Sequence, residues 1–198
     1  MVQKKSKYNT NFQADKERER EAVSSGSSTS QYNHIDLEEP FLMTQAFVER
    51  FQTNLFVDDD FCHLQACLAT FKILLKYHNP DLARYLEHNF VTCEMYAIPW
   101  FITYFSSKID TAELVIEFWD RLAQKNGDFT FIFFFAVALV LNNEMRIMSV
   151  DSASLPEVMT TMRISSMADL DRVIQVAETL DDNTPYSFKQ IPEIQKLS

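Results

Sequence analysis

The chain has 198 residues, 46% of them apolar, and a net charge of −10, which predicts one globular domain of ordinary size rather than a disordered chain. The first 20 residues hold six basic and three acidic side chains, and the remainder hold 12 basic and 25 acidic ones. Residues 21–198 are thus strongly acidic and would repel a phosphate backbone, which argues against nucleic acid as a partner. Glycine occurs only at Gly26 and Gly127, so glycine-rich nucleotide loops are excluded and helices are favoured.

Residues 1–38 differ in composition from the rest of the chain. They contain the charged stretch DKEREREA and the linker-like stretch SSGSSTS. We expect a flexible basic and Ser-rich arm over residues 1–38 and a folded helical domain over residues 39–198. The first ten residues, MVQKKSKYNT, lack the apolar core of a signal peptide, and three cysteines do not make a disulfide framework. A reduced, cytoplasmic setting is the simplest interpretation.

Helical patterning begins at Pro40. The first predicted helix has an apolar stripe made of Phe47, Val48, Phe51 and Leu55. Asp58, Asp59 and Asp60 are expected to cap a second helix, whose stripe comprises Phe61, Leu64, Leu68, Phe71, Leu74 and Leu75. Asn79 is expected to cap a short third helix that Pro80 opens.

The next apolar phrase is MYAIPWFITYF, residues 95–105, and Pro99 is expected to kink or split any helix there. Asp110 and Glu113 then have the spacing of a capping box for a helix that Gly127 would end.

Residues 129–141 form an apolar run that is interrupted only by Thr130. A membrane-spanning helix needs about 20 apolar residues, so this run predicts a helix buried at the centre of the domain. Two further helices are predicted near Pro156–Met162 and Met167–Leu180, and Ser166 with Asp169 is expected to cap the second.

No catalytic, metal-binding or cofactor-binding constellation is predicted. The histidines His34, His63, His78 and His88 are scattered along the chain. Cys62, His63 and Cys67 do not lie on one helix face, and no second ligand pair follows at zinc spacing. Helix capping explains the three consecutive aspartates at 58–60 better than cation binding does.

Several phrases, taken together and in order, resemble the C-terminal half of a TBC domain, the Rab GTPase-activating fold, and their wording is similar to that of kinase-like TBC proteins. The matching residues are Pro80, Leu82, Tyr96, Pro99, Trp100, Phe101, Phe105, Trp119, Asp120, Leu122 and Gly127. The resemblance covers about residues 40–185 and implies an all-α TBC-like fold. We expect the aromatic positions to be core, and Asp120 to be a structural hydrogen-bonding or ion-pairing group.

The resemblance also implies what this chain lacks. Family members stimulate GTP hydrolysis with an Arg in I-x-x-D-x-x-R and a Gln in Y-x-Q-G-M-N, both in the N-terminal half of the domain. Phe12, Asp15 and Arg18 have a similar spacing, but only about 14 residues separate Arg18 from Tyr32, and His34 stands where the Gln would be. An arginine finger neutralises charge on the transferred phosphoryl group. Arg18 is therefore expected to be a solvated arm charge.

These observations predict a non-enzymatic TBC-domain protein that binds a small GTPase of the Rab type or serves as an interaction subunit of a larger complex. Two alternatives stay open. One is an active Rab GTPase-activating protein whose fingers come from elsewhere, and the other is a structural subunit of a ciliary or cytoskeletal assembly. Loss of the covering half should expose apolar surface that a protein partner covers.

Overall fold

The computed structural model describes Leu42, Gln45 and residues 61–125 and 130–190, all within the unit that runs from residue 41 to residue 198. The predicted arm boundary at residues 38 and 39, the stripe from Phe47 to Leu55, and Gly127 lie outside these residues. The described elements are α3 (Cys62–His78), α4 (Pro80–His88), η2 (Cys93–Met95), α5 (Ile98–Ile102), η3 (Ser106–Lys108), α6 (Ala112–Gln124), α7 (Phe131–Asn142), α8 (Glu144–Ser149), α9 (Leu155–Thr161), α10 (Met167–Asp182) and η4 (Tyr186–Gln190). The predicted all-α class is confirmed.

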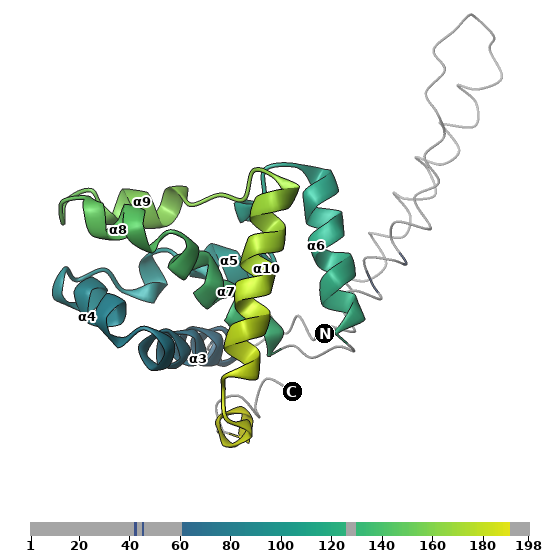
Figure 1. Cartoon of the computed structure of the whole chain (residues 1–198), viewed down its shortest axis with the longest axis horizontal. Coiled ribbons are helices and arrows are strands. Elements are labelled where there is room, and N and C mark those ends of the chain that lie inside the picture. Colours follow the sequence, from purple (N-terminus) through teal and green to yellow (C-terminus); the bar gives the residue numbers. More distant parts are fainter. Residues whose placement is uncertain (1–41, 43–44, 46–60, 126–129, 191–198) are drawn as a thin grey trace, which may run out of the picture. The chain divides into compact units, whose positions relative to one another are not determined.

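The apolar run forms α7, the centre of the core. Every residue from Phe131 to Val140 is buried, and α7 packs against both α10 and α3 (Figure 1). Burying one large apolar side chain contributes about 1.5–3 kcal/mol, so α7 gains its stability from being surrounded rather than from an amphipathic face. No helix within the described ranges is long and apolar enough to cross a membrane.

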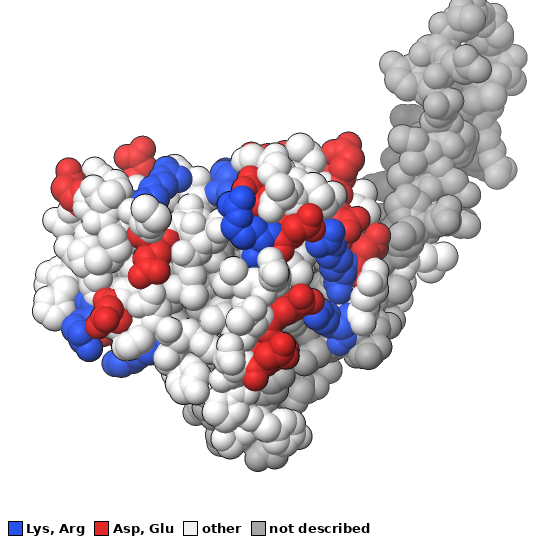
Figure 2. All heavy atoms as spheres, viewed as in Figure 1, with Lys and Arg blue, Asp and Glu red and all other residues white. Residues whose placement is uncertain are grey.

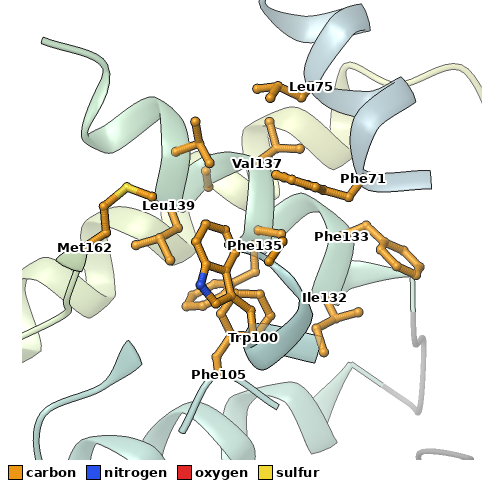
Figure 3. Packing of buried hydrophobic residues seen from close by; sticks show 14 of the residues in the cluster. Phe71, Leu75, Trp100, Phe105, Ile132, Phe133, Phe135, Val137, Leu139 and Met162 are labelled. Carbon is orange, nitrogen blue, oxygen red and sulfur yellow. The ribbon is translucent and has the colours of Figure 1, made fainter. Parts of the chain in front are cut away.

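An aromatic cluster packs on α7 (Figure 3). Phe105 lies edge-on to Phe135, with ring centroids 4.9 Å apart, and Phe118 stacks on Phe135 at 4.3 Å. Trp100 and Phe101, from α5, are fully buried beside them. The prediction that the aromatic positions of the resemblance are core is confirmed for Tyr96, Trp100, Phe101 and Phe105, whereas Trp119 is partly buried against the core.

Two of the predicted helix caps are observed. Asn79 Oδ1 accepts a hydrogen bond from Leu82 N at 3.0 Å, and Ser166 Oγ accepts one from Asp169 N at 3.1 Å, as predicted. The prediction for Asp110 is wrong, because Thr111 is the N-cap of α6 and its Oγ1 accepts from Leu114 N. Asp110 instead accepts a hydrogen bond from Ser165 Oγ. Asp58, Asp59 and Asp60, the predicted caps of α3, lie outside the described residues, and the N-cap residue of α3 is Phe61, without a side-chain cap.

Pro99 splits its segment as predicted. It lies in the first turn of the five-residue helix α5, and the residues before it form the separate turn η2. Helix α8 was not predicted. Asn79 Nδ2 ties α8 to the start of α4 by donating to Glu144 Oε1 at 2.8 Å.

Candidate functional site

The chain leaves α5 through two consecutive aromatic residues in the left-handed region, Tyr104 (φ 45°) and Phe105 (φ 62°). Phe105 N donates to Trp100 O at 2.8 Å, and Trp119 Nε1, on α6, donates to Tyr104 O at 3.0 Å. Non-glycine residues rarely adopt this conformation, and bulky ones least often. The hydrogen bond from the Trp119 indole holds this turn against α6. Trp119 therefore has a structural role.

Asp120, next to Trp119, does not have the structural role expected of it. Its side chain is exposed and makes no hydrogen bond or ion pair among the described residues. The next residue, Arg121, forms the ion pairs of this helix instead.

A buried lysine follows the left-handed turn. Lys108 is 5% exposed, its Nζ lies 5.6 Å from the centre of the Trp100 ring, and it donates to Thr160 O near the end of α9. Burial and the nearby Arg163 charge lower the pKa of Lys108 to about 8. The parallel bridge Ile109–Ile164 joins the same two segments. The Lys108 hydrogen bond and the Ile109–Ile164 bridge together hold residues 106–110 to the end of α9.

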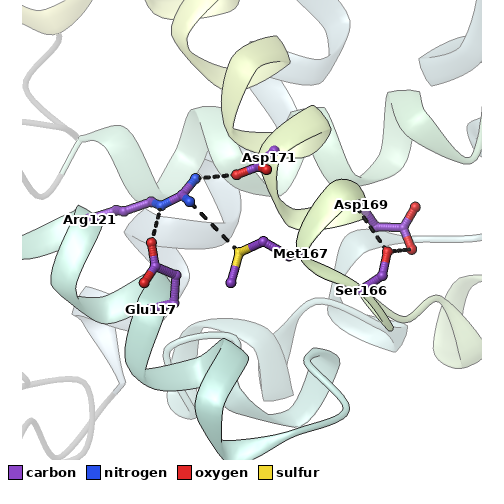
Figure 4. A network of polar contacts seen from close by, with 6 residues as sticks. All are labelled: Glu117, Arg121, Ser166, Met167, Asp169 and Asp171. Carbon is purple, nitrogen blue, oxygen red and sulfur yellow. Dashed lines mark hydrogen bonds and ion pairs between the residues drawn. The ribbon is translucent and has the colours of Figure 1, made fainter.

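A charged network connects α6 with α10 on the surface (Figures 2 and 4). Arg121 Nε donates to Glu117 Oε1 at 2.7 Å within α6, and one terminal nitrogen of Arg121 donates to Asp171 Oδ1 at 2.6 Å on α10. These hydrogen bonds, to Asp171 first and Glu117 second, raise the pKa of the guanidinium. Lys125, the C-cap residue of α6, donates from Nζ to Glu178 Oε1 of α10 at 2.6 Å.

The two interhelical ion pairs border a groove with a cavity volume of about 500 Å³. Its apolar lining comes from Phe118, Leu122, Phe131 and Ile174, and its polar lining includes both cations and both α10 carboxylates. The four charged side chains are between 31% and 53% exposed. Such exposed pairs contribute at most about 1 kcal/mol each, so they can be exchanged for ion pairs with a partner at little cost. We call this feature the α6–α10 groove.

The cysteines and histidines considered in the sequence do not assemble into a site. Cys62 is exposed whereas Cys67 is buried, and burial raises the pKa of the Cys67 thiol to about 12. His78 Nε2 lies 2.9 Å from Thr184 Oγ1, whose hydroxyl donates to Leu180 O, so His78 is the donor in this pair. Desolvation lowers the His78 pKa, because burial disfavours the charged ring. Within the described ranges no group of three or more His, Cys, Asp or Glu could hold a metal ion.

The residues compared with the catalytic fingers, namely Phe12, Asp15, Arg18, Tyr32 and His34, lie outside the described residues. Every arginine in the described part of the chain has a polar partner within the chain. Arg84, Arg121 and Arg172 form ion pairs with carboxylates, Arg146 donates to Thr161 Oγ1, and Arg163 donates to Ser107 O.

The chain belongs to the Rab-GTPase-TBC domain family, whose family model matches residues 27–148, more than half of the chain. The TBC resemblance stated from the sequence is thereby confirmed. Arg18 precedes the matched region, whereas Tyr32 and His34 lie inside it.

The curated relatives are proteins named TBC domain-containing protein kinase-like protein. Those of Homo sapiens and Gallus gallus are each 28% identical over 100 residues, which cover 50% of this chain and 11% of the relative. The relative of Dictyostelium discoideum is 32% identical over 82 residues, or 41% of this chain and 8% of the relative. The chain thus aligns with only about a tenth of the length of these proteins. No solved structure matches it.

Sequence reasoning did not identify the α6–α10 groove. The spacing of Glu117 and Arg121, four residues apart on one helix, was the one local signal of an ion pair there. Asp171 and Glu178 are about 50 residues further along the chain, so their pairing with α6 depends on the packed fold.

Proposed function

We propose that this chain is a TBC-domain protein that binds a small GTPase of the Rab type without stimulating GTP hydrolysis, and that it does so as a protein-interaction module. The family match establishes the TBC class. The binding of a small GTPase without stimulation of its hydrolysis is our proposal, based on the finger-like residues described next.

The observation that carries the proposal is the position of the only finger-like arginine. Arg18 has the F-x-x-D-x-x-R spacing, but it precedes residue 27, where the family match starts. Inside the match, His34 stands where a Y-x-Q phrase would place glutamine. Imidazole does not supply the side-chain amide that orients the attacking water. The described arginines all have polar partners within the chain, which does not favour any of them as a substitute.

The α6–α10 groove is the surface that we assign to the partner. It combines an apolar floor with exposed cations and carboxylates, as interfaces do whose centre is apolar and whose rim is polar. Arg121 and Lys125 are held in place by α10, yet they remain accessible to acidic groups of a partner. Mixed rim charges of this kind give partner specificity more than affinity.

The compartment is part of the same proposal. We infer a reduced, cytoplasmic setting, in which Cys62, Cys67 and Cys93 stay as free thiols.

A nucleotide-dependent binding experiment tests the proposal. The full chain would be immobilised and exposed to a panel of Rab-type GTPases loaded with GTP analogue or GDP. We expect at least one GTP-bound member to be retained, and about tenfold weaker retention by Arg121→Glu, which reverses a charge at the groove. Arg84→Glu is the control for charge reversal alone, because Arg84 also pairs with an aspartate but lies on α4, in a more exposed ion pair that does not line the groove. Retention of no GTPase would favour a purely structural subunit.

Single-turnover GTP hydrolysis by the retained GTPase tests the absence of catalysis. The rate should be the same with and without the chain. An acceleration that Arg18→Ala removes would overturn the proposal in favour of an active GTPase-activating protein. An acceleration that Arg18→Ala does not change would equally reject the non-catalytic role and point to another residue.

A further inference from the structure

Phe90, the residue after the C-cap of α4, has an unusual backbone and an unusual exposure. Its φ is 58° and its side chain is 85% exposed. Val91 N donates to Leu86 O at 3.0 Å, and Phe90 N donates to Glu87 O at 3.1 Å. This is the Schellman pattern, in which the left-handed position is usually glycine. This position favours glycine, yet it is occupied by Phe90. The two hydrogen bonds hold its phenyl ring exposed to solvent.

An apolar cavity of about 170 Å³ lies next to Phe90, between α3, α4 and η2. Its lining includes Phe71, Leu75, Ala83 and Leu86, and Phe90 itself contributes to the rim. An apolar cavity of about 150 Å³ is large enough to bind benzene. The cavity therefore fits one phenyl ring. We call this feature the α3–α4 cavity.

The rim of the α3–α4 cavity carries charges of both signs. Lys72 Nζ lies 3.8 Å from Glu87 Oε1, and both side chains are about half exposed. A rim with one cation and one carboxylate can match a copy of itself, since Lys72 of each copy can face Glu87 of the other.

We propose that the occupant of the α3–α4 cavity is Phe90 of a second copy of this chain. A two-fold symmetric interface requires a patch that complements itself, so that each copy offers both the inserted group and the site that receives it. The exposed phenyl ring, the cavity of matching size and the mixed charges lie on one patch. The left-handed turn fixes the ring in the projecting position before association, which lowers the entropy lost on binding. The patch is separate from the α6–α10 groove, so the dimer does not depend on GTPase binding.

The test is the mass of the full chain in solution, measured by light scattering over a wide range of protein concentrations. We expect the mass of a dimer, falling to that of a monomer on dilution. Phe90→Gly should remain monomeric at every concentration, and its melting temperature under dilute, monomeric conditions should not fall, because glycine suits the turn. This combination separates loss of the interface from loss of the fold. Met145→Gly is a comparison for exposure alone, since Met145 is 88% exposed on α8, and it should keep the dimer mass.

A second variant tests the cavity rather than the ring. Ala83→Phe should fill the cavity from within and also give a monomer, although Phe90 is intact. When the Phe90→Gly and Ala83→Phe chains are mixed, the first supplies a cavity and the second a phenyl ring. A mixed dimer weaker than the wild-type dimer is expected. A wild-type chain that is monomeric throughout overturns the proposal and leaves the cavity for an apolar side chain of another protein. A dimer that survives both substitutions overturns it as well.

Discussion

Two phenylalanines of this protein share a strained backbone conformation and lie in opposite environments. Phe105 (φ 62°) follows α5 and is completely buried, whereas Phe90 (φ 58°) follows α4 and is 85% exposed. A residue with a Cβ atom in this region costs roughly 1–2 kcal/mol relative to the right-handed conformation. The same cost is therefore present in both turns, but it is offset differently.

At Phe105 the core of the chain itself offsets the strain. The ring contacts Phe135 at 4.9 Å and Trp100 at 6.0 Å between centroids, and burial of a phenylalanine contributes about 1.5–3 kcal/mol. At Phe90 only the two backbone hydrogen bonds of the helix end act within the described residues. The backbone strain at Phe90 is not offset by packing of its ring within the chain, which suggests that the ring has a role in contact with another molecule.

The largest expected effect is at the buried member of the pair. Phe105→Ala should lower the free energy of unfolding by about 3–5 kcal/mol, because it leaves a cavity beside α7 and keeps the backbone strain. Urea denaturation measures the loss. Phe90→Ala, the matched change in the exposed turn, should alter stability by less than about 0.5 kcal/mol under monomeric conditions. Equal losses at the two positions would contradict the comparison.

The next effect concerns the hydrogen bond that fixes the buried turn. Trp119→Phe keeps an aromatic ring but removes the donor to Tyr104 O, so it should destabilise the chain by about 1–3 kcal/mol. The same denaturation experiment measures it, with Ile116→Val on the exposed face of α6 as a control expected to be near neutral. A negligible loss would mean that packing alone holds Tyr104 and Phe105 in place.

Sequence alone predicted the features that depend on local pattern. The length of the apolar run identified α7 as a buried helix, and Asn79 and Ser166 were recognised as caps because their partners are three residues away. The cap of α6 was misplaced by one residue. Asp110 and Thr111 are both good caps, and Asp110 is occupied by Ser165, 55 residues further along the chain.

The features that the sequence did not predict depend on long-range packing, or on backbone conformations that no residue type in the sequence indicates. Helix α8 has six residues and one buried side chain, Ile147, so it shows no periodicity. The left-handed turns at Phe90 and Phe105 contain no glycine to mark them. The α6–α10 groove and the α3–α4 cavity each require two helices to be placed side by side. The family resemblance, in contrast, was readable because its signature residues are core positions such as Trp100 and Phe101.

The buried turn at Phe105 also predicts a pH dependence of stability, because the amine of the neighbouring Lys108 is buried. Its pKa is about 8 in the folded chain and about 10.5 when unfolded. Between these values the unfolded chain binds one more proton than the folded chain, so stability attributable to Lys108 rises with pH. The expected slope is at most about 1.4 kcal/mol per pH unit. Below pH 8 both states are protonated and the slope vanishes.

The Lys108 prediction is measured as a difference. Unfolding free energies of the wild type and Lys108→Met would be compared from pH 7 to pH 10, so that the other titrating groups cancel. Above pH 8 the free energy of unfolding of the wild type should rise relative to that of the variant. A flat difference would place the Lys108 ammonium in contact with water, contrary to its position on the Trp100 ring.

The smallest effect has the opposite sign and bears most directly on the exposed turn. Phe90→Gly should stabilise the monomer by about 0.5–1 kcal/mol, because glycine relieves the left-handed strain while part of that gain is lost to the greater entropy of the unfolded chain. Thermal unfolding at a concentration too low for association measures the change. Phe105→Gly makes the same substitution at the same φ and should destabilise strongly, since there the ring belongs to the core. If Phe90→Gly also destabilised the monomer, the Phe90 ring would contribute to the fold of a single chain, and its exposure would need no second molecule.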